Sequence, residues 1–451
     1  MRRACFFVHN WHYIPMFDSV RAELKRRGVE SIVLILRDPT EKYFEELNRV
    51  RHSDDEVYGF ERHGRYTSAL RIWGGLPLVG PLIAAHVAYR FARSLMQREG
   101  IDVLATTDDR ALIFPLSVLH AARSLSIKSV LLPIETIMFV RALEDDKAAI
   151  PEHSSIVKRL MRSVVEHIFP ANARERSGHS VHFYQLRTLF PFLLWRSILP
   201  KNPWVRGSHA ALESVAVNSR MQLEENVRHG VSRDRMYVTG FPPHDRFTSV
   251  DRALVRKELN ADLHIRSDSK IFLIVGTHLT GEYTPEQLPA IHRELRDMYA
   301  TIVRSTPKNY TIVMKMHPQA KRDEDMRFFG SSESRSVVFL QNEWDVYRLT
   351  LVADAVCMFT SSASIAALAT DVPVLAYELK FPSYDAFYRP FTSIEKVRTI
   401  ADLEKALTKV GSTPTNDMLD RRVRDRTELG MFDGKNTERV ADLVESLIKK
   451  D

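Results

Sequence analysis

Short apolar runs alternate with helix-like segments along most of the chain, and this alternation constrains the fold more than any other feature. In the first half, the strand-like runs cover residues 4–8, 31–36, 103–106, 129–132, 214–217 and 236–239. Apolar strands separated by helices are typical of βαβ units, in which helices cover both faces of a parallel sheet. The sequence therefore predicts an α/β fold that begins β-α-β, with an amphipathic helix over residues 17–27 that ends at Gly28.

The alternation repeats in the second half of the chain. Strand candidates there cover residues 271–275, 311–314, 337–340, 355–359 and 372–376, and a last helix is expected over 438–449. Gly240 ends a strand and Pro242-Pro243 makes a stiff extended break, so we expect a domain boundary near residue 245. We predict a first lobe over residues 1–245 with an irregular insertion over about 139–206, a second lobe over 246–430, and a C-terminal helix within 431–451.

Charge and composition limit the classes of partner. The formal net charge of +7 favours anionic partners such as nucleotides, acidic glycans or an anionic membrane surface. Lys and Arg are scattered among acidic residues without a basic stripe, so no nucleic-acid partner is expected. The chain has two cysteines, Cys5 and Cys357, and both lie in predicted buried strands. We interpret them as small core residues of a protein from a reducing compartment. The apolar run after Met1 is too short for a signal peptide, which favours a cytoplasmic location.

Two hydrophobic segments raise the question of membrane contact. Residues 72–89 contain no Asp, Glu, Lys or Arg, and their length is near the lower limit for a spanning helix. Glycines and prolines interrupt this segment, so we expect a hydrophobic loop followed by a helix instead of a span. Residues 181–199 have a similar character. Either segment could rest on the inner face of the membrane or form part of the core.

Two motifs in the second half each follow a predicted strand. The first is Lys315-Met316-His317-Pro318, in which Lys315 and His317 alternate around Met316 and can leave the strand on one face. The second contains Ser361 and Ser362, which precede a helix-prone run. Hydroxyl groups at this position cap a helix, and the start of a helix can bind phosphate. Ligands of open α/β sheets bind beyond the carboxyl ends of the strands. The pair of motifs therefore predicts a phosphate site, although capping serines and a surface histidine are the alternatives.

With these motifs in this order, the chain resembles the two-lobed nucleotide-sugar glycosyltransferases of the GT-B fold. Within them it is similar to bacterial capsule polysaccharide transferases, CDP-glycerol glycerophosphotransferases and the related UDP-N-acetylglucosamine 2-epimerases. The matching segments lie mainly within residues 210–450 and are Asn218-Ser219, Gly240-Phe241-Pro242, Lys315 to Pro318, Ser361-Ser362, and Asp433-Gly434-Lys435 with Arg439. The resemblance implies two Rossmann-like parallel-sheet lobes with an interlobe cleft, a nucleotide-activated donor as substrate, and no cofactor.

The resemblance also implies which residues bind the donor, and it places them in the second lobe. His317, Ser361 and Ser362 would line the phosphate or sugar, with Lys315 as support. Gly276, Thr277 and His278 would form the loop that approaches the diphosphate, since Gly276 permits a close backbone approach. Glu378 would present its carboxylate to a ribose or sugar hydroxyl. A surface loop histidine and a surface acid remain the alternatives for His278 and Glu378.

The first lobe would bind the acceptor and supply the catalytic base. An inverting transfer needs a carboxylate or a histidine to remove the proton of the acceptor hydroxyl. Asp108 and Asp109 directly follow one predicted strand, Glu135 follows the next, and His9 and His12 lie in the loop after the first strand. The sequence does not choose among these five candidates, and the acid pair could instead be a solvated turn.

The motifs that are missing narrow the chemistry further. Paired His or Cys ligands at metal-site spacing are absent, so no metal is expected. Glycine-rich dinucleotide and P-loop motifs are absent too, which argues against dehydrogenases and P-loop NTPases. The leading hypothesis is the transfer of a sugar or a glycerol phosphate unit from a CMP-, CDP- or UDP-linked donor to a cell-envelope or capsular polysaccharide, or to a lipid-linked acceptor. A non-hydrolysing sugar-nucleotide 2-epimerase is a second hypothesis, although the serine segment lacks the glycine pair of those enzymes. A non-catalytic nucleotide-binding scaffold is the third.

Overall fold

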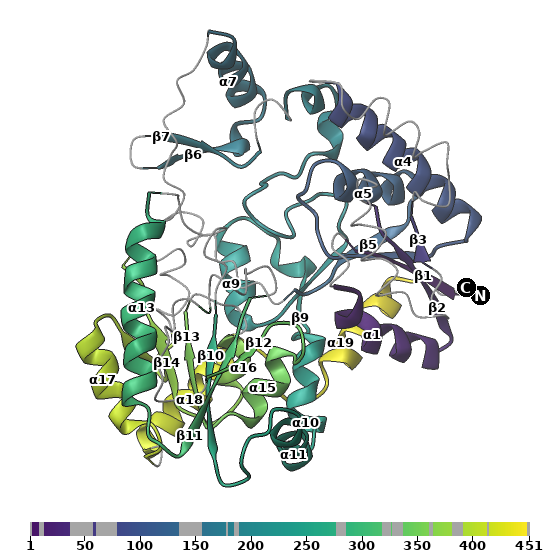
Figure 1. Ribbon diagram of the computed structural model, residues 1–451. Coiled ribbons are helices and arrows are strands. Elements are labelled where there is room, and N and C mark those ends of the chain that lie inside the picture. The colour runs from purple at the N-terminus through teal and green to yellow at the C-terminus, as the bar shows by residue number, and fades with distance from the viewer. Residues whose placement is uncertain are drawn as a thin grey trace. The chain divides into compact units, whose positions relative to one another are not determined.

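The protein is described from a computed structural model that divides into two compact units. The structure describes residues 2–8, 13–36, 57–59, 79–134, 156–176, 179–184, 189–276, 286–317, 326, 337–359, 364–380, 391–412 and 415–448. The first unit comprises Met1–Ile134, Ala148–Asp245 and Lys435–Asp451, and the second comprises Glu135–Lys147 and Arg246–Gly434. Each unit is built on a parallel sheet flanked by helices (Figure 1).

The sheet of the first unit has seven strands in the order β3-β2-β1-β4-β5-β8-β9. Every neighbouring pair is parallel, as βαβ units require. The strands are β1 (Arg2–Phe7), β2 (Val29–Leu34), β3 (Val57–Tyr58), β4 (Val103–Thr106), β5 (Lys128–Leu131), β8 (Ser214–Val217) and β9 (Met236–Val238). The crossover helices include α1 (Ile14–Arg26), α4 (Gly80–Arg98), α5 (Phe114–Ser124) and α9 (Arg220–Arg228).

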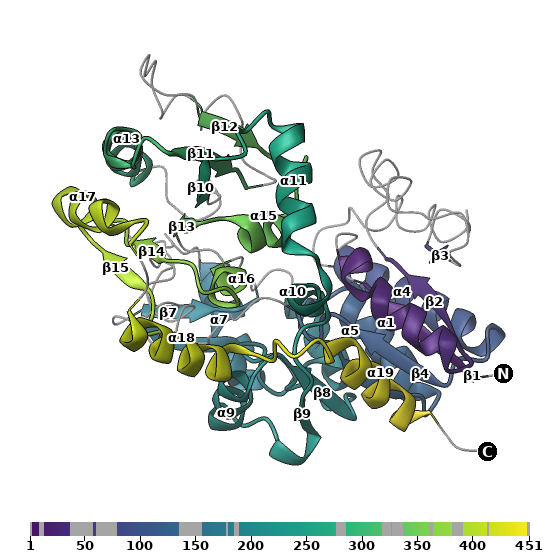
Figure 2. The ribbon, with the colours of Figure 1, turned by 90° about the horizontal axis from the view of Figure 1, so that it is seen from below.

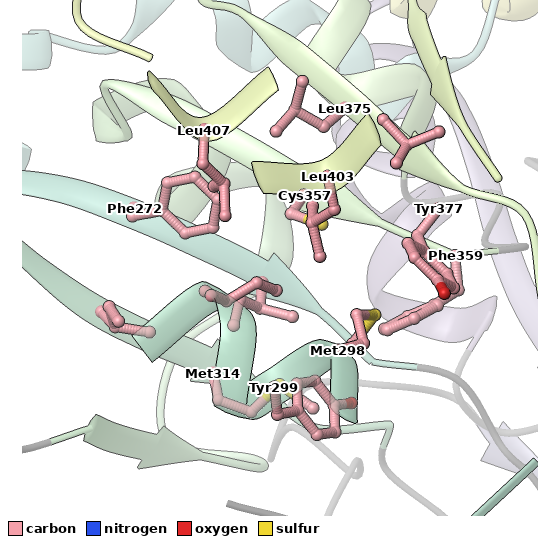
Figure 3. Close-up of a cluster of buried hydrophobic side chains, with 14 of the residues drawn as sticks. Phe272, Met298, Tyr299, Met314, Cys357, Phe359, Leu375, Tyr377, Leu403 and Leu407 are labelled. Carbon is pink, nitrogen blue, oxygen red and sulfur yellow. The ribbon is translucent and has the colours of Figure 1, made fainter. Parts of the chain in front are cut away.

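The sheet of the second unit has six parallel strands in the order β12-β11-β10-β13-β14-β15. They are β10 (Lys270–Val275), β11 (Tyr310–Lys315), β12 (Val337–Leu340), β13 (Ala355–Met358), β14 (Val374–Tyr377) and β15 (Glu395–Val397). The helices are α10 (Arg246–Ser249), α11 (Arg252–Asp262), α13 (Leu288–Ser305), α15 (Val346–Val352), α16 (Ser364–Leu368), α17 (Ile400–Lys409) and α18 (Asn416–Leu429). Met298 of α13 and Leu403 of α17 pack with Phe272 and Cys357 of the strands, which places this core between the sheet and the two helices (Figure 3).

A segment between β5 and β8 departs from the alternation. It contains α7 (Ile156–Ile168), the 3-10 helix η3 (Pro170–Asn172), the antiparallel pair β6 (Ala173–Arg176) and β7 (His179–His182), and the 3-10 helix η4 (Phe190–Ile198). Phe192 and Ile198 of this segment are buried in one cluster with Ala85 of α4 and Leu116 of α5. The described parts of the two hydrophobic segments therefore pack together as core. Among the helices that the structure describes, none is long and apolar enough to cross a membrane.

The last helix, α19 (Asn436–Leu447), returns to the first unit. The helix lies beside α1 (Figure 2). Its Val440, Ala441 and Val444 are buried in the cluster that contains Phe6 of β1 and Leu24 of α1. Ion pairs add to this contact, with Arg2 Nη1 lying 2.6 Å from Glu445 Oε1 and Arg27 Nη1 lying 2.5 Å from Asp442 Oδ1. The carboxylate of Asp245 accepts the backbone N–H groups of Asn436 at 2.9 Å and Thr437 at 2.7 Å, which satisfies two open donors at the start of the helix.

The predicted α/β fold with two parallel sheets is confirmed, and most strands lie within two residues of their predicted bounds. β4, β8 and β12 have the bounds that the sequence predicted. β3, β15 and the β6–β7 hairpin were not predicted. β3 has two residues and β15 has three, with Glu395 and Lys396 exposed, so neither carries an apolar period that a sequence pattern could reveal. The first helix begins at Ile14, three residues before its predicted start at residue 17.

Candidate functional site

The carboxyl ends of β10 and β11 bring Gly276, Lys315 and His317 together. Val275 stands opposite Lys315 in the parallel register, and the N–H of Gly276 donates to the Lys315 carbonyl at 2.8 Å. Met316 is buried in the core, and its N–H donates to the Leu340 carbonyl of β12 at 2.7 Å. Three adjacent strands are thus tied to one another at the edge where parallel sheets bind ligands.

Position 276 accommodates glycine without a shift of the neighbouring atoms, and a residue with a Cβ atom would require one. A Cβ atom there would lie 2.9 Å from Met314 Cε, 3.3 Å from the Lys315 carbonyl oxygen and 3.6 Å from Met316 Cα. The first two distances are shorter than ordinary van der Waals contact, so a larger residue would require the Met314 side chain and the Lys315 carbonyl to shift. The glycine keeps the two strand ends in contact.

Lys315 braces a neighbouring loop. Its side chain is 8% exposed, and its ammonium group donates to the carbonyl of Gln341, the first residue after β12. Burial lowers the pKa of Lys315, while the charges of Glu343 and Asp345 oppose this shift. The Gln341 side-chain amide in turn lies 3.5 Å from the carbonyl oxygen of His317. Lys315 therefore supports the backbone around His317.

Glu378 follows β14 at the same edge of the sheet. Its N–H donates to the Val397 carbonyl at 2.8 Å, which continues the pairing of β14 with β15. Its side chain is 11% exposed and forms an ion pair with Arg398, which is 71% exposed. A ligand hydroxyl that approached Glu378 would meet a carboxylate whose charge Arg398 already balances.

β13 lies between β10 and β14, and it leads toward the serine segment. Ser361, Ser362, Thr277 and His278 lie outside the described residues. The four predicted donor-site residues that are described, Gly276, Lys315, His317 and Glu378, all follow or end strands of one sheet at its carboxyl edge.

The sequence analysis missed one buried cation of the second unit. Arg422 of α18 is 0% exposed and donates to the carbonyls of Ala367 at 3.2 Å and Thr370 at 2.8 Å, at the end of α16. It lies in the run Asp420-Arg421-Arg422-Val423-Arg424-Asp425-Arg426, which has the composition of a solvated helix face. The only local signal was the apolar Leu419 and Leu429 at helical spacing from it, which is too weak to mark a buried arginine.

In the first unit, the acid pair after β4 divides into two environments. Asp109 is 0% exposed, and its Oδ2 accepts the backbone N–H groups of Gly207 at 2.9 Å and His209 at 3.3 Å. Burial raises the pKa of Asp109 to about 6, while the charge of Arg110 opposes the shift. Asp108 is more accessible: its Oδ1 accepts the N–H of Arg110 at 2.9 Å, and its side chain is 19% exposed.

Polar side chains also tie together the strand ends around this pair. Arg206 Nη2 donates to the carbonyls of Thr107 at 2.7 Å and Leu132 at 3.3 Å, which follow β4 and β5. Asn218, after β8, donates through Nδ2 to the Ile134 carbonyl at 2.7 Å. A pocket at this carboxyl edge is lined by residues of β1, α1 and the loops after β4 and β5, among them Tyr13, Arg21, Thr107 and Leu132. Glu135 and His9 lie outside the described residues.

Within the described ranges, no group of three or more His, Cys, Asp or Glu side chains is placed to hold a metal ion. The polar groups that the structure places at the two strand edges include a histidine, carboxylates, a supporting lysine, arginines and an asparagine.

Comparison with protein families identifies the chain. The model of the CDP-glycerol:poly(glycerophosphate) glycerophosphotransferase family matches residues 214–446, just over half of the chain. The chain therefore belongs to this family. Family membership confirms the predicted activity class, a transferase that uses a nucleotide-activated donor. No curated protein matches the chain in sequence.

Comparison with solved structures supports the fold. The putative UDP-N-acetylglucosamine 2-epimerase of Listeria monocytogenes superimposes with a TM-score of 0.57 at 13% identity, covering 100% of this chain and 97% of the other. The UDP-GlcNAc 2-epimerase of Neisseria meningitidis, bound to UDP-GlcNAc, gives 0.58 at 12% identity, with 99% and 100% covered. CalG4, the calicheamicin glycosyltransferase, gives 0.52 at 13% identity, with 99% and 98% covered. At these identities the likeness concerns the fold, and it confirms the predicted GT-B architecture.

The environment of Asp109 predicts a pH dependence of stability. Its folded pKa of about 6 lies above its ordinary value of 3.8, so the folded chain holds this proton more tightly than the unfolded chain. The contribution to stability is complete below about pH 4 and is lost as the pH rises through 6. Relative to wild type, the free energy of unfolding of Asp109→Asn should rise by about 2 kcal/mol from pH 4 to pH 7, because the amide never ionises.

Urea unfolding at several pH values measures this difference. The buried His209 and His244, whose pKa values burial lowers to about 4 and about 3, change stability in the opposite direction, but they are present in both proteins and cancel. Asp420→Asn, at an exposed position of α18, is the control, and its free energy of unfolding relative to wild type should not change with pH. The same lack of pH dependence for Asp109→Asn would contradict the prediction.

Proposed function

We propose that the chain transfers a glycerol phosphate unit, or a sugar, from a CMP-, CDP- or UDP-linked donor to a cell-envelope or capsular polysaccharide, or to a lipid-linked form of it. The observation that carries this proposal is the family match over residues 214–446, which includes the whole carboxyl edge formed by β11, β10, β13 and β14. The reaction needs a base for the acceptor hydroxyl and donors for the departing phosphate, and no cofactor.

In this proposal the second unit binds the donor. His317, with Ser361 and Ser362, would contact the phosphate, because hydrogen-bond donors fixed in place before the reaction stabilise the charge that develops on a leaving group. Gly276, Thr277 and His278 would lie along the diphosphate. Glu378 would accept a hydroxyl of the ribose or the transferred unit, with Arg398 holding its carboxylate in place. Lys315 supports the His317 backbone through Gln341.

A ligand screen tests the donor site. We expect a cytidine or uridine nucleotide to raise the melting temperature of the wild-type chain, since a ligand at 100 times its dissociation constant stabilises the folded state by about 2.7 kcal/mol. The panel is CMP, CDP, UDP, GDP, CDP-glycerol and UDP-GlcNAc. His317→Asn should weaken binding of the best nucleotide at least tenfold and leave the melting temperature without ligand unchanged. His264→Asn, on the exposed loop before β10, is the matched control.

The outcomes of this screen also separate the alternatives. Conversion of UDP-GlcNAc in the absence of an acceptor would indicate an epimerase, and binding without turnover on any acceptor would indicate a scaffold. Undiminished binding by His317→Asn would remove that residue from the donor site. Turnover that persists in EDTA supports the proposed independence from metal, whereas loss of turnover that Mg²⁺ restores contradicts it.

For the catalytic base we propose Asp108. Asp109 is fully buried and its Oδ2 already accepts two backbone N–H groups, so it anchors the loop around Gly207 and is not free to reach a substrate. A base must come within hydrogen-bond distance of the hydroxyl that it deprotonates. Asp108 keeps part of its side chain accessible at the same strand end.

Replacement of Asp108 tests this assignment. Asp108→Asn should lower kcat by a factor of about 10² to 10⁴, the usual contribution of general base catalysis, and should leave the donor dissociation constant unchanged. Asp234→Asn, an exposed position before β9, serves as the control. A kcat near that of wild type would move the proposed role to Glu135 or His9.

We also propose that the chain works in the cytoplasm, in peripheral contact with the inner face of an anionic membrane. The net charge of +7 supports this contact, as do two exposed apolar side chains of the first unit, Leu160 (65% exposed) and Phe190 (37% exposed). The chain should co-sediment with vesicles of anionic lipid at low salt and be released at high salt, because salt screens the attraction. Neutral vesicles are the control. Failure to bind anionic vesicles at low salt would contradict the contact.

A further inference from the structure

Helix α18 holds the end of α16 through two arginine side chains. Arg422 Nη1 donates to the carbonyls of Ala367 and Thr370 at 3.2 and 2.8 Å. One turn later, Arg426 Nε donates to the Leu368 carbonyl at 2.7 Å, and its Nη2 lies 2.6 Å from Asp371 Oδ1. Three backbone carbonyls at the end of α16 are therefore bound by guanidinium groups of one neighbouring helix.

The same arginine reaches a second segment of the chain. Arg422 Nε donates to Ser393 Oγ at 2.9 Å, and Nη2 donates to the Ser393 carbonyl at 3.3 Å. Asp425, one turn further along α18, accepts the Ser393 N–H at 2.7 Å, the Ser393 hydroxyl at 2.6 Å and the Thr392 N–H at 3.1 Å. Arg422 thus joins the turn after α16 to the segment that precedes β15.

Burial of the Arg422 charge requires a desolvation free energy that its hydrogen-bond partners must offset. Apolar residues of similar volume often stabilise a fold equally well. Arg422 differs from an apolar residue in fixing four acceptors in defined directions, since the guanidinium group presents its N–H donors in a rigid plane. Its bonds specify where α16 lies.

α16 is the element that connects β13 to β14. It begins at Ser364, directly after the segment to which the proposed function assigns the donor phosphate, and its other end carries the carbonyls that Arg422 binds. With only five residues, the helix has little packing surface of its own to fix its position.

We propose that Arg422 is a positioning residue for the donor: by holding the Ala367 and Thr370 carbonyls it fixes α16, and donor affinity depends on the position of this helix. The inference rests on the proposed function for the location of the donor. Arg422 acts at a distance and touches no substrate.

The test compares Arg422→Lys with wild type. Lysine keeps the charge but cannot reach four acceptors in a plane. We expect the KM for the donor to rise at least tenfold, with the KM for the acceptor within twofold of wild type. Amide hydrogen exchange should become faster in a peptide that covers residues 364–370 and stay unchanged in peptides of the first unit. Arg424→Lys, exposed on the same helix, is the matched control and should match wild type in every measurement.

A less disruptive variant tests the inference if Arg422→Lys does not fold. Ser393→Ala removes one acceptor of Arg422 and one donor to Asp425, and it should raise the donor KM about two- to fivefold, as expected for the loss of one hydrogen bond. Unchanged exchange of residues 364–370, or faster exchange with an unchanged donor KM, would overturn the inference.

The two proposals fail in different ways. If the wild-type chain binds no nucleotide, the proposed function fails, and the donor role of Arg422 fails with it. If the wild type binds a nucleotide and the Arg422→Lys variant binds it equally well, only the role of Arg422 is overturned.

Discussion

Parallel strand pairing is the constraint on which the rest of the structure depends. A parallel sheet buries both of its faces, so each connection must cross over the sheet, and every strand then ends at the same edge. In the second unit this places Gly276, Lys315 and Glu378 on one edge, although about 100 residues separate the first from the last. The candidate site follows from the topology, because nothing else in the sequence brings these residues near each other.

Buried polar side chains bind backbone atoms at the strand ends that strand pairing does not satisfy. Lys315 donates to the Gln341 carbonyl, Asp109 accepts N–H groups of the Gly207 loop, and Asn218 donates to the Ile134 carbonyl. In each case a polar group next to a strand end satisfies backbone atoms that the ladder leaves open. An unpaired backbone group in such a place costs free energy, so these side chains fix the loops in which the proposed chemistry takes place.

The regular alternation of apolar strands and helices could be predicted from the sequence, whereas contacts between residues far apart in the chain could not. Strands such as β4 and β8 are buried apolar runs, so their pattern predicted their bounds. The strand-end position of Lys315 and His317 also followed from the sequence. The division of labour between Asp108 and Asp109 did not, because it depends on Gly207 and His209, about 100 residues away in the chain. Arg422 was hidden for the same reason, since its acceptors lie about 30 to 55 residues before it.

The return of α19 to the first unit has a consequence for biosynthesis. A ribosome makes β1 long before α19, so the cluster around Phe6 and Leu24 lacks Val440 and Val444 until α19 has been translated. All residues of the second unit precede α19 in the chain, so that unit can complete its core while the first still awaits a part of its own. Of the two units, the one whose synthesis begins earlier therefore finishes folding later, and until then its exposed apolar face is the part of the nascent chain that most needs protection.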